Sequence, residues 1–349
     1  MQLQQRINAF AQLGKFLLQF AEDTPKRDES VLNNELYFAE MQEALQLAKA
    51  QNTWFTDENL QFTCKNWGEA LTETNINTWL SGYKISDKDV NNKVAIVMAG
   101  NIPLVGFHDF LCVLLSGHAV IGKLSSNDKI LLPFVSKYLI AVEPLFSNKI
   151  ELTTKTLENF DAVIATGSDN TALYFEHYFG KYPHIIRKNR NSVAILTGNE
   201  TPQQMEALAD DIFRYFGLGC RNVSKIYVPL NYNWDHFFNG MFAWKHVIHN
   251  HKYINNYDYN KAIYLMSNIK LLDNEFLLLK KDTGFSSPIS VFFYETYTSL
   301  EELSEKLKTE KENIQCIISE KHIAFGEAQQ PKLSDYADGV DTLDFLLGL

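Results

Sequence analysis

Apolar residues in the first quarter of the chain recur at three- and four-residue steps, a spacing that places them on one face of a helix. This pattern predicts helices over residues 3–22, 35–51 and 57–82. From about residue 90 the pattern changes to short apolar runs without polar alternation. Each run is followed by a turn and then by a helical pattern, which indicates buried strands separated by helices.

The apolar runs that predict these strands are Val94–Met98, Ala119–Leu124 and Ala162–Ala165, and the helices expected after them cover 104–116, 128–142 and 169–179. Strands buried on both faces and joined through helices are typical of parallel sheets. Because such crossovers are right-handed, we expect a doubly wound α/β domain.

The second half of the chain repeats this alternation. Its expected strands are Ser192–Leu196, Lys225–Val228, Ile289–Phe293 and Gln315–Ile318, and its expected helices cover 201–216, 235–245 and 299–308. No linker rich in proline or glycine separates the halves, so we expect them to share an interface. Active sites commonly lie at interfaces of this kind.

Composition narrows the class of protein. With 32 Lys and Arg against 42 Asp and Glu, the 349-residue chain carries a net charge of −10, which argues against binding to nucleic acid or to an anionic membrane surface. The N-terminus lacks the features of a signal peptide, and no apolar window is long enough to span a membrane. The four cysteines show no paired spacing, which is typical of a cytoplasmic protein with free thiols.

Cys220 is the sharpest chemical signal, because it follows Gly217-Leu218-Gly219. Two glycines permit a tight turn that can aim a thiol into a cleft and present backbone N–H groups to an oxyanion. The neighbouring Arg221 can lower the pKa of a thiol beside it. A buried, inert cysteine is the competing interpretation, and the residues alone leave both open.

Polar residues follow each of the first three strands. Asn101 can donate to an oxyanion or fix its own turn, and Lys123 can hold a ribose or a phosphate or be solvated. Ser125 and Ser126 add donors after Lys123. The segment Thr166-Gly-Ser-Asp-Asn170 can receive a phosphate at a helix N-terminus, although the usual three-glycine fingerprint is missing.

Two further clusters have weaker interpretations. The basic residues Lys181, Arg187, Lys188 and Arg190 can meet a phosphate-rich ligand or form a solvated segment. The histidines at positions 246, 249 and 251 have neither cysteines nor a helical His pair beside them, so we expect no metal site.

Taken in order, these motifs resemble the aldehyde dehydrogenase superfamily, and within it the acyl-CoA reductase family typified by the LuxC fatty-acid reductase component. The stretches that carry the resemblance are Gly180–Arg190, Phe216–Lys225 and Asp335–Thr342. The resemblance covers about residues 90–349. It implies two doubly wound α/β domains with the active-site cleft between them, with helices and the cofactor domain over 1–191, the catalytic domain over 192–327 and a C-terminal segment, 328–349, packed back on the body.

The resemblance also implies a role for each site residue. Cys220 falls at the nucleophile and Asn101 at the oxyanion amide. Lys123, with Ser125 and Ser126 after it, falls at the adenosine ribose of the cofactor. Thr166, Gly167 and Ser168 fall at the turn beside the cofactor pyrophosphate, where Ala172 replaces the second glycine of the usual pattern.

Departures from the oxidative enzymes define the expected reaction. Where those enzymes carry the glutamate that activates water, this chain has Arg187-Lys-Asn-Arg190, and Gly284–Pro288 lacks the glutamate that binds the nicotinamide ribose. Ser126 stands where NAD-preferring relatives carry a glutamate, which favours NADPH. We therefore expect NADPH-dependent reduction of a long-chain acyl-CoA or acyl-carrier thioester to an aldehyde. The alternatives are a short-chain acylating aldehyde dehydrogenase and a non-catalytic acyl-binding subunit, and a homo-oligomer is left open.

Overall fold

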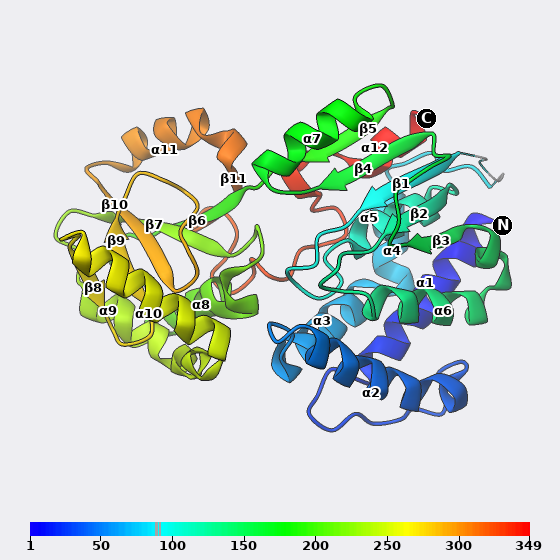
Figure 1. Cartoon of the computed structure of the whole chain (residues 1–349), viewed down its shortest axis with the longest axis horizontal. Helices are drawn as coiled ribbons and strands as arrows, with labels where there is room; N and C mark the ends of the chain where they lie inside the picture. Colours follow the sequence, from blue (N-terminus) through cyan, green and yellow to red (C-terminus); the bar gives the residue numbers. More distant parts are fainter. Residues whose placement is uncertain (88–89, 91) are drawn as a thin grey trace. The chain divides into compact units, whose positions relative to one another are not determined.

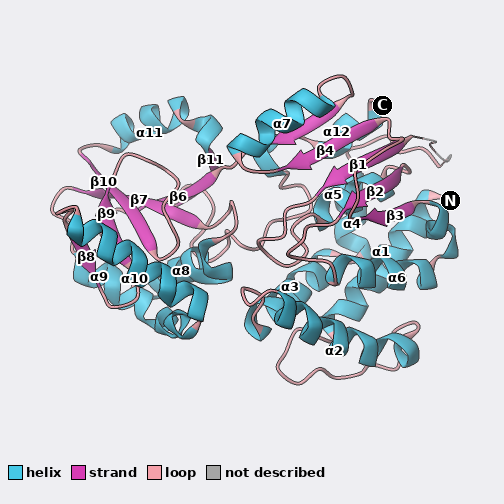
Figure 2. Cartoon of the chain, viewed as in Figure 1, coloured by secondary structure: helices cyan, strands magenta, loops and turns pink. Residues whose placement is uncertain are grey.

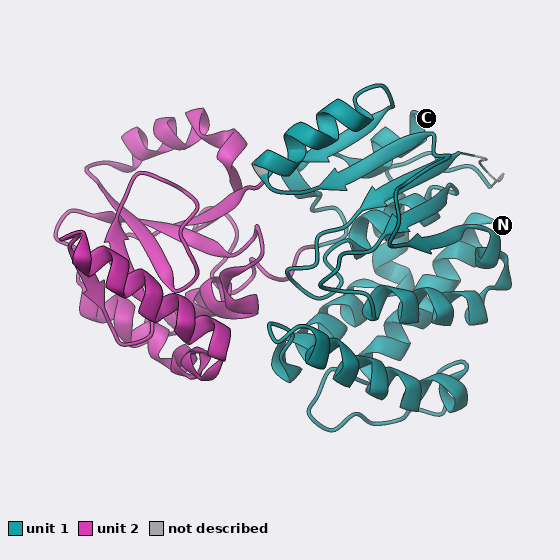
Figure 3. Ribbon diagram, in the orientation of Figure 1, with its two compact units in different colours: residues 1–188, 332–349 teal, residues 189–331 magenta. Residues whose placement is uncertain are grey.

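The computed structural model of the chain describes residues 1–87, 90 and 92–349. They divide into two compact units, Met1–Lys188 with Lys332–Leu349 (unit 1) and Asn189–Pro331 (unit 2) (Figure 3). Each unit combines a sheet with helices, as Figure 2 shows, so the predicted α/β class is confirmed.

Unit 1 holds a five-stranded, fully parallel sheet in the order β3-β2-β1-β4-β5 (Figure 1). Its strands are β1 Lys93–Val97, β2 Ala119–Lys123, β3 Ile150–Thr153, β4 Ala162–Thr166 and β5 His184–Arg187. Its helices are α1 Leu3–Leu18, α2 Asn34–Gln51, α3 Asp57–Ala70, α4 Glu73–Leu80, α5 Phe107–Leu115, α6 Leu131–Val142, α7 Asp169–Phe179 and α12 Thr342–Leu347, with 3-10 turns at Pro144–Asn148 and Ala337–Gly339. The chain winds outward from β1 in both directions, which makes this sheet doubly wound.

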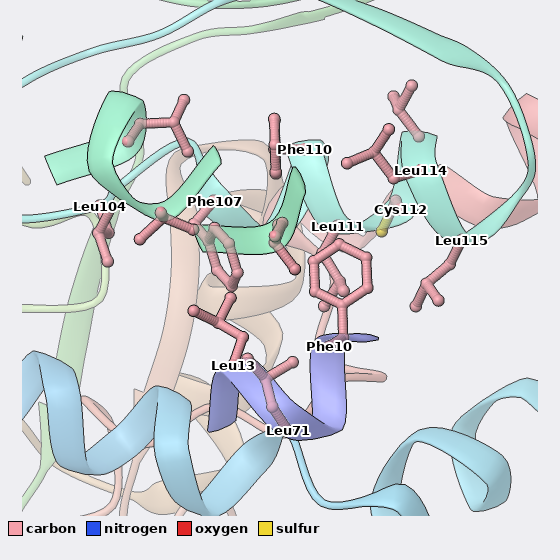
Figure 4. Packing of buried hydrophobic residues seen from close by; sticks show 14 of the residues in the cluster. Phe10, Leu13, Leu71, Leu104, Phe107, Phe110, Leu111, Cys112, Leu114 and Leu115 are labelled. Atoms are coloured by element: carbon pink, nitrogen blue, oxygen red, sulfur yellow. The ribbon is translucent and has the colours of Figure 1, made fainter. Parts of the chain in front are cut away.

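Both faces of this sheet are buried, which explains why its strands show no polar alternation. Val94 and Ile96 face a large cluster that includes residues of α1, α5 and α6. Ala95 and Val163 face the opposite cluster, which includes Phe175 of α7. In Figure 4, Phe10 and Leu13 of α1 pack against residues of α5.

The C-terminal segment is fixed to unit 1 by side chains from distant parts of the sequence. His108 bonds to the Leu333 carbonyl at 2.8 Å, Trp79 donates to the Tyr336 hydroxyl at 2.8 Å, and Tyr83 donates to Asp341 at 2.6 Å. The Asp335–Thr342 motif therefore has a structural role, because it locks the end of the chain onto the helices of this unit.

Unit 2 holds a six-stranded sheet in the order β11-β6-β7-β10-β9-β8, parallel except for the β8–β9 pair. Its strands are β6 Asn191–Ile195, β7 Val223–Pro229, β8 Leu271–Asp273, β9 Leu278–Lys281, β10 Val291–Tyr297 and β11 Ile314–Ile318. Its helices are α8 Pro202–Phe213, α9 Trp234–Met241, α10 His251–Met266 and α11 Leu300–Thr309, with 3-10 turns η2 Arg214–Gly217, η3 Phe242–His249 and η4 Lys311–Asn313.

Candidate active site

The turn that carries Cys220 begins where α8 ends. Tyr215 (φ 54°), Phe216 (φ 57°) and Gly217 (φ 75°) are left-handed in succession. This conformation costs a non-glycine residue roughly 1–2 kcal/mol, so two aromatic residues in it must be held by their surroundings. Both aromatic side chains are buried. The result is a sharp reversal that places Cys220 just ahead of β7.

Asn222 holds this reversal in place from a buried position, with 2% of its surface exposed. Its Oδ1 accepts a hydrogen bond from the Gly219 backbone N–H at 2.8 Å. Its Nδ2 donates to the carbonyl oxygens of Asp211 (3.1 Å), Ile212 (3.3 Å) and Arg214 (2.7 Å). One amide thus joins the last turn of α8 to the residue before Cys220.

Two neighbours of this turn tie it to other elements. The Ser192 hydroxyl at the start of β6 donates to the Cys220 carbonyl at 2.9 Å. Arg221 Nε donates to the Ala328 carbonyl at 2.5 Å. Arg221, considered above for its effect on the thiol, therefore also has a structural task.

Cys220 differs from the other three cysteines in being exposed. Burial raises the pKa of Cys64 to about 12 and that of Cys112 well above its usual value. Figure 4 shows Cys112 among the packed side chains of α5, and Cys316 is buried on β11. The interpretation of Cys112 and Cys316 as core residues is confirmed, and the buried alternative for Cys220 is wrong.

A cavity of about 280 Å³ adjoins the Cys220 turn within unit 2. Gly217, Leu218 and Gly219 line it, as do residues at the starts of β6, β7 and β10. Asn189 and Arg190 also line it. Among the described residues that line this cavity, none carries a carboxylate.

In unit 1, the predicted site residues lie at or just beyond the ends of neighbouring strands, at the carboxyl edge of the parallel sheet. Asn101 follows β1, Lys123 ends β2 beside Val97 of β1, and Thr166 ends β4 on the other side of β1. This edge, where the winding direction of the chain reverses, is where open α/β sheets bind ligands.

The loops after β1 and β2 are packed tightly together. A Cβ built on Gly100 would lie 2.4 Å from the Ser125 Oγ, so only glycine fits there. The Asn52 side chain, at the end of α2, donates to the carbonyls of Gly100 (3.3 Å) and Asn127 (3.4 Å). Ser125 Oγ accepts from the Asn127 N–H at 3.2 Å, which leaves its own proton to donate. Ser126 is exposed.

The turn after β4 is shaped by helix packing. A Cβ on Gly167 would lie within 3.0 Å of Thr171 and within 2.9 Å of Phe175. Ser168 caps α7, because its hydroxyl accepts from the Thr171 N–H at 3.3 Å. Gly167 and Ser168 therefore have local structural roles whatever they bind.

The basic residues Arg187 and Lys188 are neighbours in the sequence but lie in different environments. Arg187 is buried and forms an ion pair with Asp109, and it also donates to the Thr342 hydroxyl at 2.9 Å. Burial opposes the charge, but the Asp109 carboxylate holds the pKa of Arg187 above its usual value. Lys188 lies 3.3 Å from Glu176 at the surface. Arg187 therefore belongs to the core of unit 1, and the predictions that it meets a phosphate-rich ligand or lies in a solvated segment are both wrong.

Solved structures of aldehyde dehydrogenases share this fold. Aldehyde dehydrogenase 21 of Physcomitrella patens, in complex with succinate, matches with a TM-score of 0.65 and 13% identity over 92% of this chain and 74% of its own. The indole-3-acetaldehyde dehydrogenase AldA of P. syringae, in complex with NAD⁺, matches with a TM-score of 0.60 and 12% identity over 87% and 72%. An NADP-dependent enzyme of E. coli matches with a TM-score of 0.61 and 10% identity over 91% and 78%. The fold is therefore that of the aldehyde dehydrogenases.

The family is defined by sequence. The model of the acyl-CoA reductase (LuxC) family matches residues 15–233, a span that includes Cys220 and the whole parallel sheet of unit 1. The chain belongs to this family of oxidoreductases, and the recognised resemblance is confirmed. No curated protein sequence matches the chain. Among the described residues, no helix is long and apolar enough to cross a membrane.

Proposed function

We propose that the protein reduces a long-chain acyl thioester to a fatty aldehyde with NADPH, through a thioacyl intermediate on Cys220. The main observation in support is the Cys220 turn: an exposed thiol on a strained turn that hydrogen bonds hold in place beside a cavity. Strain of this kind persists only where the surrounding structure maintains it, and it gathers at functional sites. Unit 2 is then the catalytic unit, and unit 1 the cofactor-binding unit.

In the first half of the reaction, the Cys220 thiolate attacks the thioester carbonyl. A carbon–sulfur bond to Cys220 forms, the bond to the carrier sulfur breaks, and the carrier leaves as a thiolate that takes up a proton. The carrier is CoA or an acyl-carrier protein. Covalent capture divides one difficult step into two easier ones.

The second half returns Cys220 to its starting state. A bound reduced nicotinamide supplies the hydride that this chemistry requires. Addition of this hydride to the thioacyl carbon would leave a thiohemiacetal oxyanion on Cys220. When this oxyanion collapses, the carbonyl double bond re-forms, the carbon–sulfur bond breaks, Cys220 leaves as a thiolate, and the aldehyde departs. No carboxylate lies among the residues that line the cavity, so the described chain offers no water-activating base there. This favours reduction of the thioacyl enzyme over its hydrolysis.

For Asn101 we propose the oxyanion role that the family resemblance implies. Its support is its position in the loop that follows β1, at the ligand-binding edge of a doubly wound sheet. The Cys220 backbone N–H is the proposed second donor. One donor of this kind typically contributes about 10²–10³ in rate.

The residues at the carboxyl edge of the unit 1 sheet fit a nicotinamide dinucleotide. Lys123 supplies a cation, while Ser125 and Thr166 supply hydroxyl groups. The close approach of Gly100 to Ser125 holds the Ser125 loop against the end of β1. We propose that Lys123 holds the adenosine ribose, and that Thr166, Gly167 and Ser168 lie beside the pyrophosphate.

The choice of NADPH rests on Ser126. An exposed hydroxyl there does not repel a 2′-phosphate as a carboxylate would, and Ser125, Ser126 and Lys123 offer it hydrogen bonds. A charge-assisted hydrogen bond contributes about 1.5–3 kcal/mol, or roughly 10–150-fold in affinity. The fold relatives include both an NAD⁺ complex and an NADP-dependent enzyme, so the argument depends on these residues.

The proposal is tested by following NADPH oxidation with acyl-CoAs of graded length and detecting the aldehyde. Cys220→Ala should abolish turnover and leave cofactor binding intact. A length profile confined to short chains would instead support the acylating aldehyde dehydrogenase. No aldehyde with any thioester, from protein that binds acyl-CoA, would support the non-catalytic subunit.

A further inference from the structure

The cavity beside Cys220 has an apolar, buried wall and an exposed rim. The wall residues, each at most 8% exposed, are Ile212, Phe213, Phe216, Tyr253, Leu277, Val291 and Phe292. The rim contains Asn189, Gly217, Ser286 and Pro288, which are exposed. A ligand that fills this cavity must therefore present hydrocarbon to the wall and a polar end to the rim.

The one polar side-chain group among these wall residues, the Tyr253 hydroxyl, is hydrogen-bonded to the backbone outside the wall. The Tyr253 hydroxyl donates to the Phe276 carbonyl at 2.9 Å, so its ring is what remains for the cavity. The Phe216 ring lies 6.0 Å from the Tyr253 ring, measured between centroids. The left-handed backbone at Phe216 is therefore coupled to the shape of this wall.

The glycine turn that precedes Cys220 forms part of the lining of the cavity. Gly217, Leu218 and Gly219 line it, and Cys220 is the next residue along the chain. The backbone of Cys220 therefore adjoins the lining of the cavity.

We propose that the cavity receives the hydrocarbon chain of the acyl group, and that Leu277 sets how much chain it holds. This inference rests on the proposed function and identifies the acyl subsite within it. A cavity of 150 Å³ admits benzene, so about 280 Å³ has room for roughly ten carbon atoms of a chain. The remaining carbon atoms of a longer chain lie outside the cavity.

Leu277 is suited to this role because its backbone is fixed independently of its side chain. Its N–H donates to the Asn274 Oδ1 at 2.9 Å, and its carbonyl accepts from the Asn274 N–H at 3.3 Å. It lies just before β9, with 1% of its surface exposed. A change of side chain here alters the cavity volume while the turn keeps its hydrogen bonds.

The experiment measures kcat/KM for acyl-CoAs from two to sixteen carbons with the full-length protein. Each buried methylene group is worth about fourfold, from about 0.8 kcal/mol, so kcat/KM should rise to about ten carbons and then level off. Leu277→Trp should lower kcat/KM for decanoyl-CoA at least tenfold relative to acetyl-CoA. Leu277→Ala should move the plateau to longer chains.

The control is Leu307→Ala, because Leu307 of α11 is also buried but packs in a separate cluster with Val193 and Tyr227. It should lose stability and keep the wild-type length profile. If Leu277→Trp and Leu277→Ala both keep that profile while the folded enzyme still forms aldehyde, the subsite assignment is overturned and the proposed function stands. If Leu277→Trp raises KM for NADPH equally at every chain length, the cavity holds part of the cofactor and the assignment is likewise overturned.

Discussion

Asn222 accepts a hydrogen bond from the backbone N–H of Gly219 at 2.8 Å, one residue before the proposed nucleophile. The other end of the same amide binds three carbonyl oxygens at the end of α8. A buried polar group that is fully engaged in this way fixes backbone position, because each broken bond leaves an unsatisfied group away from water. Asn222 is thus a positioning residue for Cys220.

Asn222→Asp should test this role, because it replaces the three-way donor with a carboxylate oxygen of similar size. The three carbonyls then face negative charge, and we expect the free energy of unfolding to fall by about 1–3 kcal/mol. We expect kcat to fall roughly 10–100-fold with KM for acyl-CoA little changed. Steady-state kinetics and denaturant unfolding measure the two effects.

Asn34→Asp is the matched control, since Asn34 is also buried and donates its amide to Gln19 and the Asp28 carbonyl, far along the chain from Cys220. It should lose stability at unchanged kcat. Equal stability losses in both variants, with kcat retained in Asn222→Asp, would show that Asn222 only supports folding.

The fold could be predicted where the sequence pattern is strong. The helix expected over 169–179 is α7, and the three apolar strands of unit 1 appear within one residue at each end. The helix expected over 57–82 is instead two helices, because Thr72 caps α4 by accepting from the Asn75 N–H at 3.2 Å. A threonine followed by a glutamate is the sequence signal that was available for this break.

Other elements lacked a readable pattern. The edge strands β3 and β5 have four residues each, too few to show a period. Helix α10 was missed because polar and aromatic residues alternate around it without an apolar stripe. Its buried residues are Tyr253, Tyr257 and Asn260, which a search for aliphatic spacing does not detect.

Some residues of the candidate site could likewise be predicted from the sequence, and others could not. The two glycines before Cys220 pointed to its turn, but nothing in the sequence set Asn222 or Asn52 apart from other asparagines. Their importance comes from carbonyl groups that only the folded chain brings to them. The prediction that Arg187 binds a ligand or is solvated was wrong, because the basic residues around it in the sequence give no sign of the buried Asp109 that pairs with it.

The thiols should differ sharply in reactivity with iodoacetamide at pH 8. A thiol whose pKa burial has raised to about 12, like that of Cys64, is thiolate in only about one molecule in ten thousand at this pH. Cys112 and Cys316 are also buried, so we expect Cys220 alone to be alkylated. Acyl-CoA without reductant should acylate the same residue, and peptide mass spectrometry maps both adducts. Modification of Cys64 or Cys112 in folded protein, with Cys220 untouched, would refute the assigned nucleophile.

The cofactor preference should be reversible at Ser126. Its side chain is exposed, and its carbonyl accepts from Gln51 Nε2 at 3.1 Å, so Ser126→Glu adds charge without disturbing the loop. We expect the wild type to favour NADPH in kcat/KM, and Ser126→Glu to shift the ratio toward NADH by roughly tenfold or more. Lys123→Ala should weaken both cofactors, NADPH more. A wild-type preference of tenfold for NADH would mean that the 2′-phosphate lies elsewhere.

Stability should depend on pH through Asp211, a fully buried carboxyl at the end of α8. Burial raises its pKa to about 7, although the N–H groups of Gly326 (2.7 Å) and Ala328 (2.9 Å) oppose the shift. In the unfolded chain an aspartate loses its proton near pH 4. Between about pH 4 and 7 the folded state therefore binds a proton that the unfolded state has lost, so the contribution of Asp211 to stability falls as the pH rises.

Asp211→Asn cannot ionise and should lack this contribution. The difference in free energy of unfolding, variant minus wild type, should increase from pH 4 to pH 7 by on the order of 1.4 kcal/mol for each unit of pH, and then stay constant. Guanidinium unfolding at pH 4.5, 6 and 8 measures this difference. A difference that is independent of pH would mean that Asp211 is ionised in the folded protein throughout. The Gly326 and Ala328 N–H groups would then outweigh its burial, and the segment they belong to would be held by a carboxylate.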